Sequence, residues 1–334
     1  MKKITQNMTP RCIGRYLIDM PADLVLNSQF NVSIDDVKIE IRPMTQSAFE
    51  MQLEEYEKKL RRETMYGEPD VPYLRKIEAA PQVQLGKVFN RVDSPGGEGF
   101  VRILDLWAWR DGYLVKMEIK AYDTSDKKYQ SEAWAKDFPT DLPEKLAHLL
   151  SMYERVRGRA DNEVPTEQGV CIHNGFVLGP PSDEEEVLVS YHQKDSQDVY
   201  FSLETASNFR EDTNLLDRGR QIEAGAAEAD GHTVRKGRHE AHGIKYDEWL
   251  LTGKTTDRVK GQLFSFEANS KLGNAKAPII MITFHNGYRI PAAPRTMEES
   301  AVLPDITQAT LSEAESVALW DAVIPTLRPR PGAF

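Results

Sequence analysis

One short stretch occurs twice in this chain, once near the start and once just past the middle. The first copy runs from Cys12 to Pro21 and the second from Cys171 to Pro180. In both copies a Cys-Ile pair opens a short apolar run with an aromatic residue, and a proline follows nine positions after the cysteine. Proline cannot donate a hydrogen bond to a sheet, so it marks a strand's end. The degenerate repeat therefore predicts two related modules, each beginning with this strand.

The two cysteines of the repeat are the only cysteines in the chain. Two cysteines do not make a disulfide framework, and their spacing fits no zinc motif. A bridge would need Cα atoms within about 7 Å of each other. The first strands of two separate modules rarely approach so closely, so we expect Cys12 and Cys171 to be buried free thiols.

Length and composition fit a globular protein of two domains. The 334 residues exceed what one hydrophobic core usually serves, and 40% of them are apolar. A formal net charge of −10 argues against a nucleic-acid binder, which needs a basic surface. There is no run of about 18 apolar residues that could span a bilayer. Polar Thr5-Gln6-Asn7 stands after Met1-Lys2-Lys3 in place of an apolar core, so we expect no export signal in this stretch.

Local patterns in the first half predict an antiparallel sheet with packed helices. Apolar residues recur at helical spacing between Thr45 and Glu63, and again between Pro143 and Arg157. Strands at residues 100–109 and 113–122 flank Asp111-Gly112, which is a strong hairpin signal. The polar stretch Arg159–Gln168 has no periodicity and is interpreted as a linker.

The second half repeats this order of elements. We predict a helix over residues 208–222, a loop over residues 224–231 and an irregular crossing over residues 291–304. Ser312 and Glu315 form a capping box that opens the last helix. The predicted fold class is α+β, with two tandem related modules, each an antiparallel sheet with packed helices. The predicted boundaries are 1–158 for the first module, 159–169 for the linker and 170–334 for the second module.

The sequence offers no catalytic constellation, and we expect no catalytic, cofactor-binding or metal-binding residues. A Gly-x-Ser-x-Gly motif is absent, so an esterase of that kind is not supported. His239 and His242 are three positions apart beside glycines, with no helix to present both rings to one metal. We interpret them as part of a solvated loop.

Two groups of side chains are candidates for contact with a protein partner. One group is an acidic run, which is either a solvated loop or a docking surface for a basic partner. The other is a pair of tryptophans on one strand face, which is either core or an interface anchor. The candidates are Asp183, Glu184, Glu185 and Glu186 in the first group, and Trp107 and Trp109 in the second.

Several stretches together resemble a known family. They are the repeat at Cys12–Pro21, Gly175–Val187 with its three consecutive glutamates, Gly243–Leu250, Phe264–Glu267, Pro278–Phe284 and Leu319–Arg328. The chain resembles the two-domain immunity proteins that neutralise phospholipase (lipase) effectors of bacterial type VI secretion systems. The resemblance spans nearly the whole chain and rests on many weak positions rather than on a chemical motif.

The resemblance implies an inhibitor rather than an enzyme, without a cofactor. Its partner would be the cognate phospholipase effector, which such proteins hold by a mobile lid so that lipid cannot enter. It would act in the periplasm, where the effector arrives, and both modules would hold the partner together. Two alternatives remain: an envelope hydrolase with a site assembled from both modules, and a periplasmic adaptor or scaffold.

Overall fold

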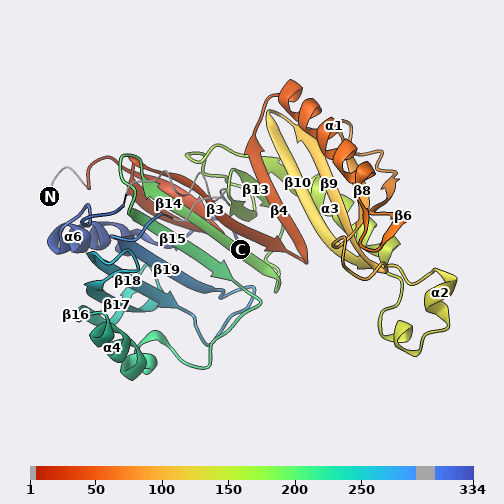
Figure 1. Cartoon of the computed structure of the whole chain (residues 1–334). Helices are drawn as coiled ribbons and strands as arrows, with labels where there is room; N and C mark the ends of the chain where they lie inside the picture. Colours follow the sequence, from red (N-terminus) through yellow and green to blue (C-terminus); the bar gives the residue numbers. More distant parts are fainter. Residues whose placement is uncertain (1–4, 291–304) are drawn as a thin grey trace. The chain divides into compact units, whose positions relative to one another are not determined.

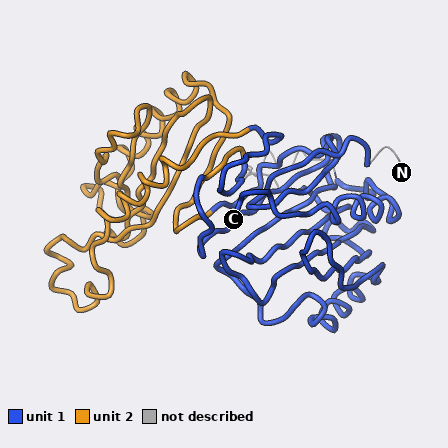
Figure 2. The backbone as a smooth tube through the Cα atoms, turned by 180° about the vertical axis from the view of Figure 1, so that it is seen from behind, with its two compact units in different colours: residues 1–32, 160–173, 178–334 blue, residues 33–159, 174–177 orange. Residues whose placement is uncertain are grey.

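The structure is a computed structural model, and it describes residues 5–290 and 305–334 (Figure 1). The predicted crossing at 291–304 lies outside the described residues. The helices are α1 (Gln46–Arg62), α2 (Lys127–Gln130), α3 (Leu142–Arg155), α4 (Gly219–Glu228) and α6 (Glu313–Val323), with short 3₁₀ helices η1 (Ala133–Asp137), η2 (Leu215–Arg218) and η3 (Ile324–Thr326). The chain divides into two compact units, coloured separately in Figure 2.

Unit 1 comprises residues 1–32, 160–173 and 178–334. Its main sheet has the strand order β16-β17-β18-β19-β15-β14-β3. These strands are β16 (His232–Ala241), β17 (Ile244–Lys254), β18 (Lys260–Ala268), β19 (Ile279–Asn286), β15 (Val199–Ala206), β14 (Glu185–Gln193) and β3 (Leu24–Ile34). A small sheet contains β1 (Met8–Ile13), β2 (Tyr16–Pro21) and β20 (Arg328–Pro329), and β12 (Gly169–Ile172) lies in the same unit.

Helices pack on both faces of the unit 1 sheet. On one face, the α6 residue Trp320 lies 5.7 Å from Phe264 between ring centroids. On the other face, Lys236 of β16 pairs with Glu223 of α4 and lies over the ring of Trp249. The sheet is therefore covered by apolar and charged contacts from two helices, as a two-sided core requires.

Unit 2 comprises residues 33–159 and 174–177. Its sheet has the order β4-β10-β9-β8-β7. The strands are β4 (Val37–Pro43), β10 (Tyr113–Tyr122), β9 (Val101–Arg110), β8 (Gly86–Val92) and β7 (Leu74–Glu78). Two smaller pairs are β5 (Thr64–Met65) with β6 (Glu68–Pro72), and β11 (Val156–Gly158) with β13 (Gly175–Leu178). The chain passes from unit 1 to unit 2 within β3.

Short-range sequence signals match the structure closely. Thr45 is the N-cap of α1, and its side chain accepts a hydrogen bond from the backbone N–H of Ala48. Asp111 and Gly112 both have positive φ (51° and 88°), which is the type I′ geometry that joins β9 to β10. Ser312 and Glu315 form the predicted capping box of α6. The α+β fold class is confirmed.

Two predicted loops are instead regular structure. Of the stretch predicted as a loop at residues 224–231, residues 224–228 form the second half of α4, because the alanines favour a helix and Ala226 is buried. His239 lies in strand β16 opposite Tyr246, and the strand continues to a two-residue turn at His242-Gly243. The histidine prediction failed because the pairing of β16 with β17 outweighed the glycine-rich composition.

Both copies of the repeat form strands and turns, and the two copies contact each other. In the first copy, β1 and β2 are joined by a turn at Gly14, whose φ is 57°. The backbones of Gly14 and Cys171 exchange two hydrogen bonds of 2.8 Å. A Cβ at Gly14 would lie 2.5 Å from Thr205 Oγ1, so only glycine fits this approach. The beginnings of both copies of the repeat therefore lie in unit 1, hydrogen-bonded to each other.

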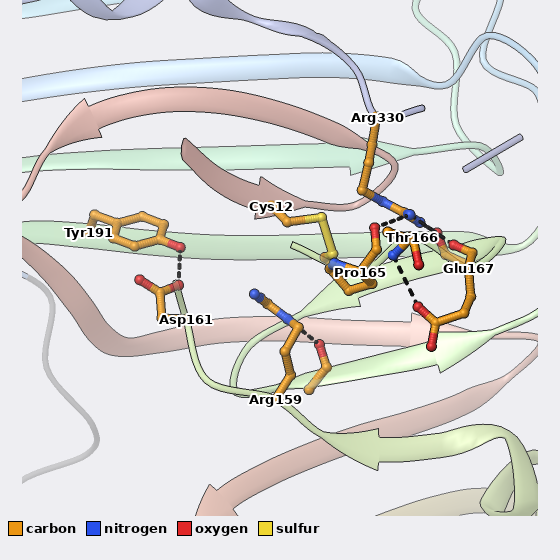
Figure 3. The surroundings of a disulfide bond; sticks show 11 residues. Cys12, Arg159, Asp161, Pro165, Thr166, Glu167, Tyr191 and Arg330 are labelled. Atoms are coloured by element: carbon orange, nitrogen blue, oxygen red, sulfur yellow. Dashed lines mark hydrogen bonds between the residues drawn. A yellow bond between two sulfur atoms is a disulfide. The ribbon is translucent and has the colours of Figure 1, made fainter. Parts of the chain in front are cut away.

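This pairing overturns the expectation of free thiols. Cys12 and Cys171 form a disulfide with a Cα–Cα distance of 5.7 Å across a sequence separation of 159 (Figure 3). Both cysteines belong to unit 1 and both are buried. The expectation was wrong because it placed the two copies in different compact units, whereas backbone hydrogen bonds bring them side by side.

The stretch predicted as a linker is also held in place. Residues 160–168 belong to unit 1. The guanidinium of Arg330 donates to the carbonyl oxygens of Pro165, Glu167 and Gly169 at 2.7–2.8 Å (Figure 3). Tyr191 donates its hydroxyl to Asp161 over 2.6 Å. The compact units therefore differ from two contiguous modules joined by an unstructured segment, since residues 1–32 and 160–168 both fold with the C-terminal half.

Candidate functional site

The acidic run divides into an exposed part and a structural part. Asp183 and Glu184 are exposed in the turn before β14, and Asp183 accepts a hydrogen bond from the backbone N–H of Ala275 over 2.9 Å. Glu185 is buried, and its carboxylate accepts from Arg15 Nε over 2.9 Å. Glu186 accepts from the side-chain amide of Asn31 over 2.6 Å. Asp183 and Glu184 are thus the most exposed carboxylates of the run.

Two exposed apolar side chains lie on loops next to this acidic turn. Phe209 is 44% exposed and Leu272 is 53% exposed. Their loops touch, because a Cβ at Gly273 would lie within 2 Å of the Phe209 carbonyl oxygen. Ala275, in the second of these loops, bonds Asp183. We call Asp183, Glu184, Phe209 and Leu272 the loop surface. It combines apolar contact area with a charged margin, as protein interfaces do.

An open cavity of about 380 Å³ adjoins Leu272. Its lining mixes Arg238, Lys245 and Lys271 with the acidic Asp247 and Glu267. Arg238 Nε donates to Asp247 over 2.9 Å, and hydrogen bonding to Asp247 raises the pKa of Arg238. Arg238 and Asp247 therefore neutralise each other within this lining.

The two tryptophans lie in the core of unit 2. Trp107 is buried and stacks on Tyr56 of α1 with ring centroids 4.4 Å apart. Trp109 is half-buried against the same core cluster and donates its ring N–H to the Met44 carbonyl oxygen over 2.8 Å. Their shared strand face is the one covered by α1, so the core interpretation accounts for both. Neither tryptophan is on an open face of the sheet.

The histidines considered for a metal site lie apart from any cluster of ligands. His239 Nε2 lies 3.1 Å from Glu248 Oε1, while His242 occupies the turn after β16. Glu248 is also bound by Arg235 and by the ring N–H of Trp320. Within residues 5–290 and 305–334, no group of three His, Cys, Asp or Glu side chains could hold a metal ion.

One further exposed aromatic stands on unit 2. Tyr66, in the turn between β5 and β6, is 82% exposed. Tyr66, Phe209 and Leu272 were not among the contact residues predicted from the sequence. A signal was available for two of them, since Tyr66 and Leu272 each precede a glycine in a turn, where an apolar or aromatic side chain has no core to enter.

Comparison with protein families then identifies the chain. Residues 9–159 match the N-terminal domain of Tle cognate immunity protein 4, and residues 163–332 match its C-terminal domain. The chain belongs to this family. It is thus an immunity protein of a type VI secretion effector rather than an enzyme, and the family resemblance noted in the sequence is confirmed.

Solved structures share the fold of this immunity protein. In the crystal structure of a Tle4–Tli4 complex, one chain is 17% identical with a TM-score of 0.72, and the match covers 98% of this chain and 99% of that one. The apo immunity protein TplEi of Pseudomonas aeruginosa is also 17% identical, with a TM-score of 0.71 and the same coverage. TplEi complexed with an "L" peptide is 18% identical, with a TM-score of 0.66 and again 98% and 99% coverage. No curated protein matches the sequence.

The helices of this immunity protein are short. Among the helices that the structure describes, none is long and apolar enough to cross a membrane.

Proposed function

We propose that this protein binds a type VI phospholipase effector in the periplasm and inhibits it by holding its mobile lid, which keeps lipid from the active site. The observation that carries the proposal is the match of both parts of the chain to the two domains of Tle cognate immunity protein 4. The solved Tle4–Tli4 complex supports direct binding as the mode of inhibition.

The disulfide supports the periplasm as the site of action. Disulfides persist in the bacterial periplasm and are rare in the cytosol, where thiols are kept reduced. Cys12 and Cys171 are 2% and 0% exposed, so their bond is part of the interior of unit 1. An antidote that needs this bond would reach its stable state in the compartment where the effector acts.

Both units offer surfaces for the effector. Unit 1 presents the loop surface, and unit 2 presents Tyr66. Exposed aromatic and apolar side chains of this kind supply most of the binding energy in protein interfaces. When two linked units bind one partner, the second contact is intramolecular, and affinity can exceed that of either contact by roughly 10²–10⁴. Such a gain would suit an antidote that must release its effector slowly.

The first test is inhibition by the intact chain. The purified protein is mixed with the phospholipase encoded beside its gene, and lipid hydrolysis and binding are both measured. We expect a stoichiometric complex and loss of hydrolysis, and cells exporting the effector should survive only when this protein is exported too. Unimpaired hydrolysis in the presence of excess protein would contradict the proposal.

The second test asks whether both units contribute. Cutting the chain at residue 158 is unsuitable because it would separate Cys12 from Cys171 and unit 1 from its first strands. Full-length Tyr66→Ala and Phe209→Ala/Leu272→Ala variants avoid this. We expect each to weaken binding about tenfold and the combination to multiply both losses. Met51→Ala removes an exposed apolar side chain of α1 and serves as the control.

A further inference from the structure

Three polar side-chain groups of unit 2 converge on one open point beside Gly99. A Cβ built on Gly99 would lie 2.8 Å from Tyr129 Oη, 3.5 Å from Arg75 Nη2 and 4.0 Å from Lys128 Nζ. This point is one bond length from the Gly99 backbone, so the glycine lets the three groups approach the chain closely. Two cationic nitrogens and a hydroxyl therefore converge beside the backbone of residue 99.

The fold directs these side chains to the same place. Arg75 lies at an irregularity in the pairing of β7 with β8, between Leu74 and Lys76. Such bulges re-aim a side chain out of the regular alternation of a strand. Lys128 and Tyr129 belong to α2, in the long loop between β10 and α3 that extends from the sheet in Figure 1.

This loop is held at both its neck and its interior. At the neck, Tyr122 N–H donates to the Asp141 carboxylate over 2.6 Å, and Asp141 N–H donates to the Tyr122 carbonyl oxygen over 3.1 Å. In the interior, Phe100 lies 5.6 Å from Tyr129 and 4.7 Å from Trp134 between ring centroids. The positions of Lys128 and Tyr129 are thus set by packing rather than by a free loop.

A buried arginine adds positive charge to the same cluster. Arg102 of β9 is 9% exposed, and its only ion pair among the described residues is with Asp123, over 3.2 Å. Its Nε and Nη1 atoms are buried without a hydrogen-bond partner in that part of the chain, as is Nε of Arg75. Burial and the charge of Arg75 lower the pKa of Arg102. The positive charge of Arg75 therefore disfavours the charged form of Arg102.

This arrangement is costly for folding alone. Three cations meet one carboxylate, and a buried donor without a partner costs about 1–3 kcal/mol, or more when it is charged. Elsewhere in unit 2 a buried arginine is matched: Arg91 bonds both Asp105 and Glu118. Among residues 5–290 and 305–334, Asp123 is the one carboxylate that forms an ion pair with Arg75 or Arg102.

We propose that Arg75, Arg102, Lys128 and the Tyr129 hydroxyl form a binding site for an oxyanion, and that an acidic side chain of the effector occupies it in the complex. Arginine donors match the planar geometry of a carboxylate, and lysine adds a point charge. The oxyanion site is inferred from the geometry of unit 2, whereas the identity of its occupant depends on the proposed function.

Inorganic phosphate and acetate test the site in the full-length protein without the effector. At low ionic strength, with sodium chloride at matched ionic strength as reference, phosphate at roughly ten times its Kd should raise Tm by about 2–4 °C. Arg75→Gln should abolish the shift because it removes a cationic donor. Gly99→Ala should reduce it without changing any charge, because its methyl group would lie 2.8 Å from Tyr129 Oη and displace that hydroxyl. Lys127→Gln, one position from Lys128 on the same exposed turn, should retain it.

Two results would overturn the oxyanion site. One is a wild-type shift with phosphate and acetate no larger than with chloride. The other is an equal shift in wild type and Arg75→Gln. A shift with phosphate alone would contradict a carboxylate as the occupant, whereas a shift with acetate supports it.

The effector itself tests the occupant. We expect Arg75→Gln to weaken effector binding about tenfold and Lys127→Gln to leave it unchanged. If the wild-type protein bound the effector and Arg75→Gln bound equally well, the proposed occupant would be wrong while the proposed function stood. If the wild-type protein did not bind the effector, the proposed function would fail, and the phosphate measurement would still decide the site.

Discussion

Arg15 and Glu185, 170 positions apart in the sequence, form a buried ion pair in which Arg15 Nε donates to a Glu185 carboxylate oxygen over 2.9 Å. Arg15 also donates to the carbonyl oxygens of Pro180 and Ala333. One side chain in the first hairpin thus connects the start of β14 and the C-terminal segment. Glu185, which the sequence placed in a surface run, is part of the interior of unit 1.

This ion pair predicts a sharp contrast between neighbouring glutamates. Glu185→Ala leaves the guanidinium of Arg15 buried without its carboxylate, so we expect a loss of about 3–5 kcal/mol in the free energy of unfolding. Glu184→Ala, at the exposed neighbouring position, should change it by less than about 0.5 kcal/mol. Urea unfolding of the two variants measures both values. Similar stabilities would show that the pair does not form.

The disulfide predicts a second loss of stability. Reduction should lower the free energy of unfolding by about 3–5 kcal/mol, because the bond closes a loop of 159 positions. Cys12→Ala, Cys171→Ala and the double variant should lose similar amounts, since each removes the same bond. The denatured protein should contain titratable thiols only after reduction. Additive losses, or thiols titrating without reductant, would contradict the bond.

The acidic turn predicts an effect on association rate rather than on dissociation. Asp183→Asn/Glu184→Gln keeps side-chain acceptors but removes two exposed charges. At low salt we expect binding to the effector to slow several-fold, with little change in koff, and the difference should fade as salt is added. Glu228→Gln, an exposed change on α4, is the control. If Glu228→Gln slowed association equally, the decrease in association rate would be due to net charge alone.

His285 predicts a specific loss of stability in acid. Burial beside Tyr200, whose ring lies 4.3 Å away, lowers the pKa of His285 to about 4. The unfolded chain, with a histidine pKa of about 6.5, then binds more protons below that pH. Neutral His285 therefore makes its full contribution to the free energy of unfolding above about pH 6.5. That contribution falls by about 2–3 kcal/mol as the pH is lowered to 4.

His285→Phe keeps a flat ring against Tyr200 but cannot take up a proton. Between pH 7 and pH 4.5, its free energy of unfolding should fall less than that of the wild-type protein. Urea unfolding at several pH values gives both slopes. Identical slopes would mean that His285 does not contribute to the acid sensitivity.

Elements that depend on neighbours a few positions away were predictable from the sequence. Thr45 caps α1, Asp111-Gly112 turns β9 into β10, and Ser312 with Glu315 opens α6, because each acts through hydrogen bonds or backbone angles within four residues. Weak similarity to the family along most of the chain could also be recognised from the sequence. It identified the immunity family without any chemical motif.

Which distant residues contact each other could be seen in the folded structure but not in the sequence. The repeat was visible, but whether its copies start two modules or pair with each other depends on backbone hydrogen bonds between Gly14 and Cys171. The sequence of the acidic run does not distinguish its members. In the structure Glu185 is buried in an ion pair with Arg15, whereas Asp183 and Glu184 are exposed. Arg75 and Lys128 likewise converge beside Gly99 from different elements. Charge pairing and burial depend on distances of a few ångströms in space. These distances cannot be derived from the separation of two residues in the sequence.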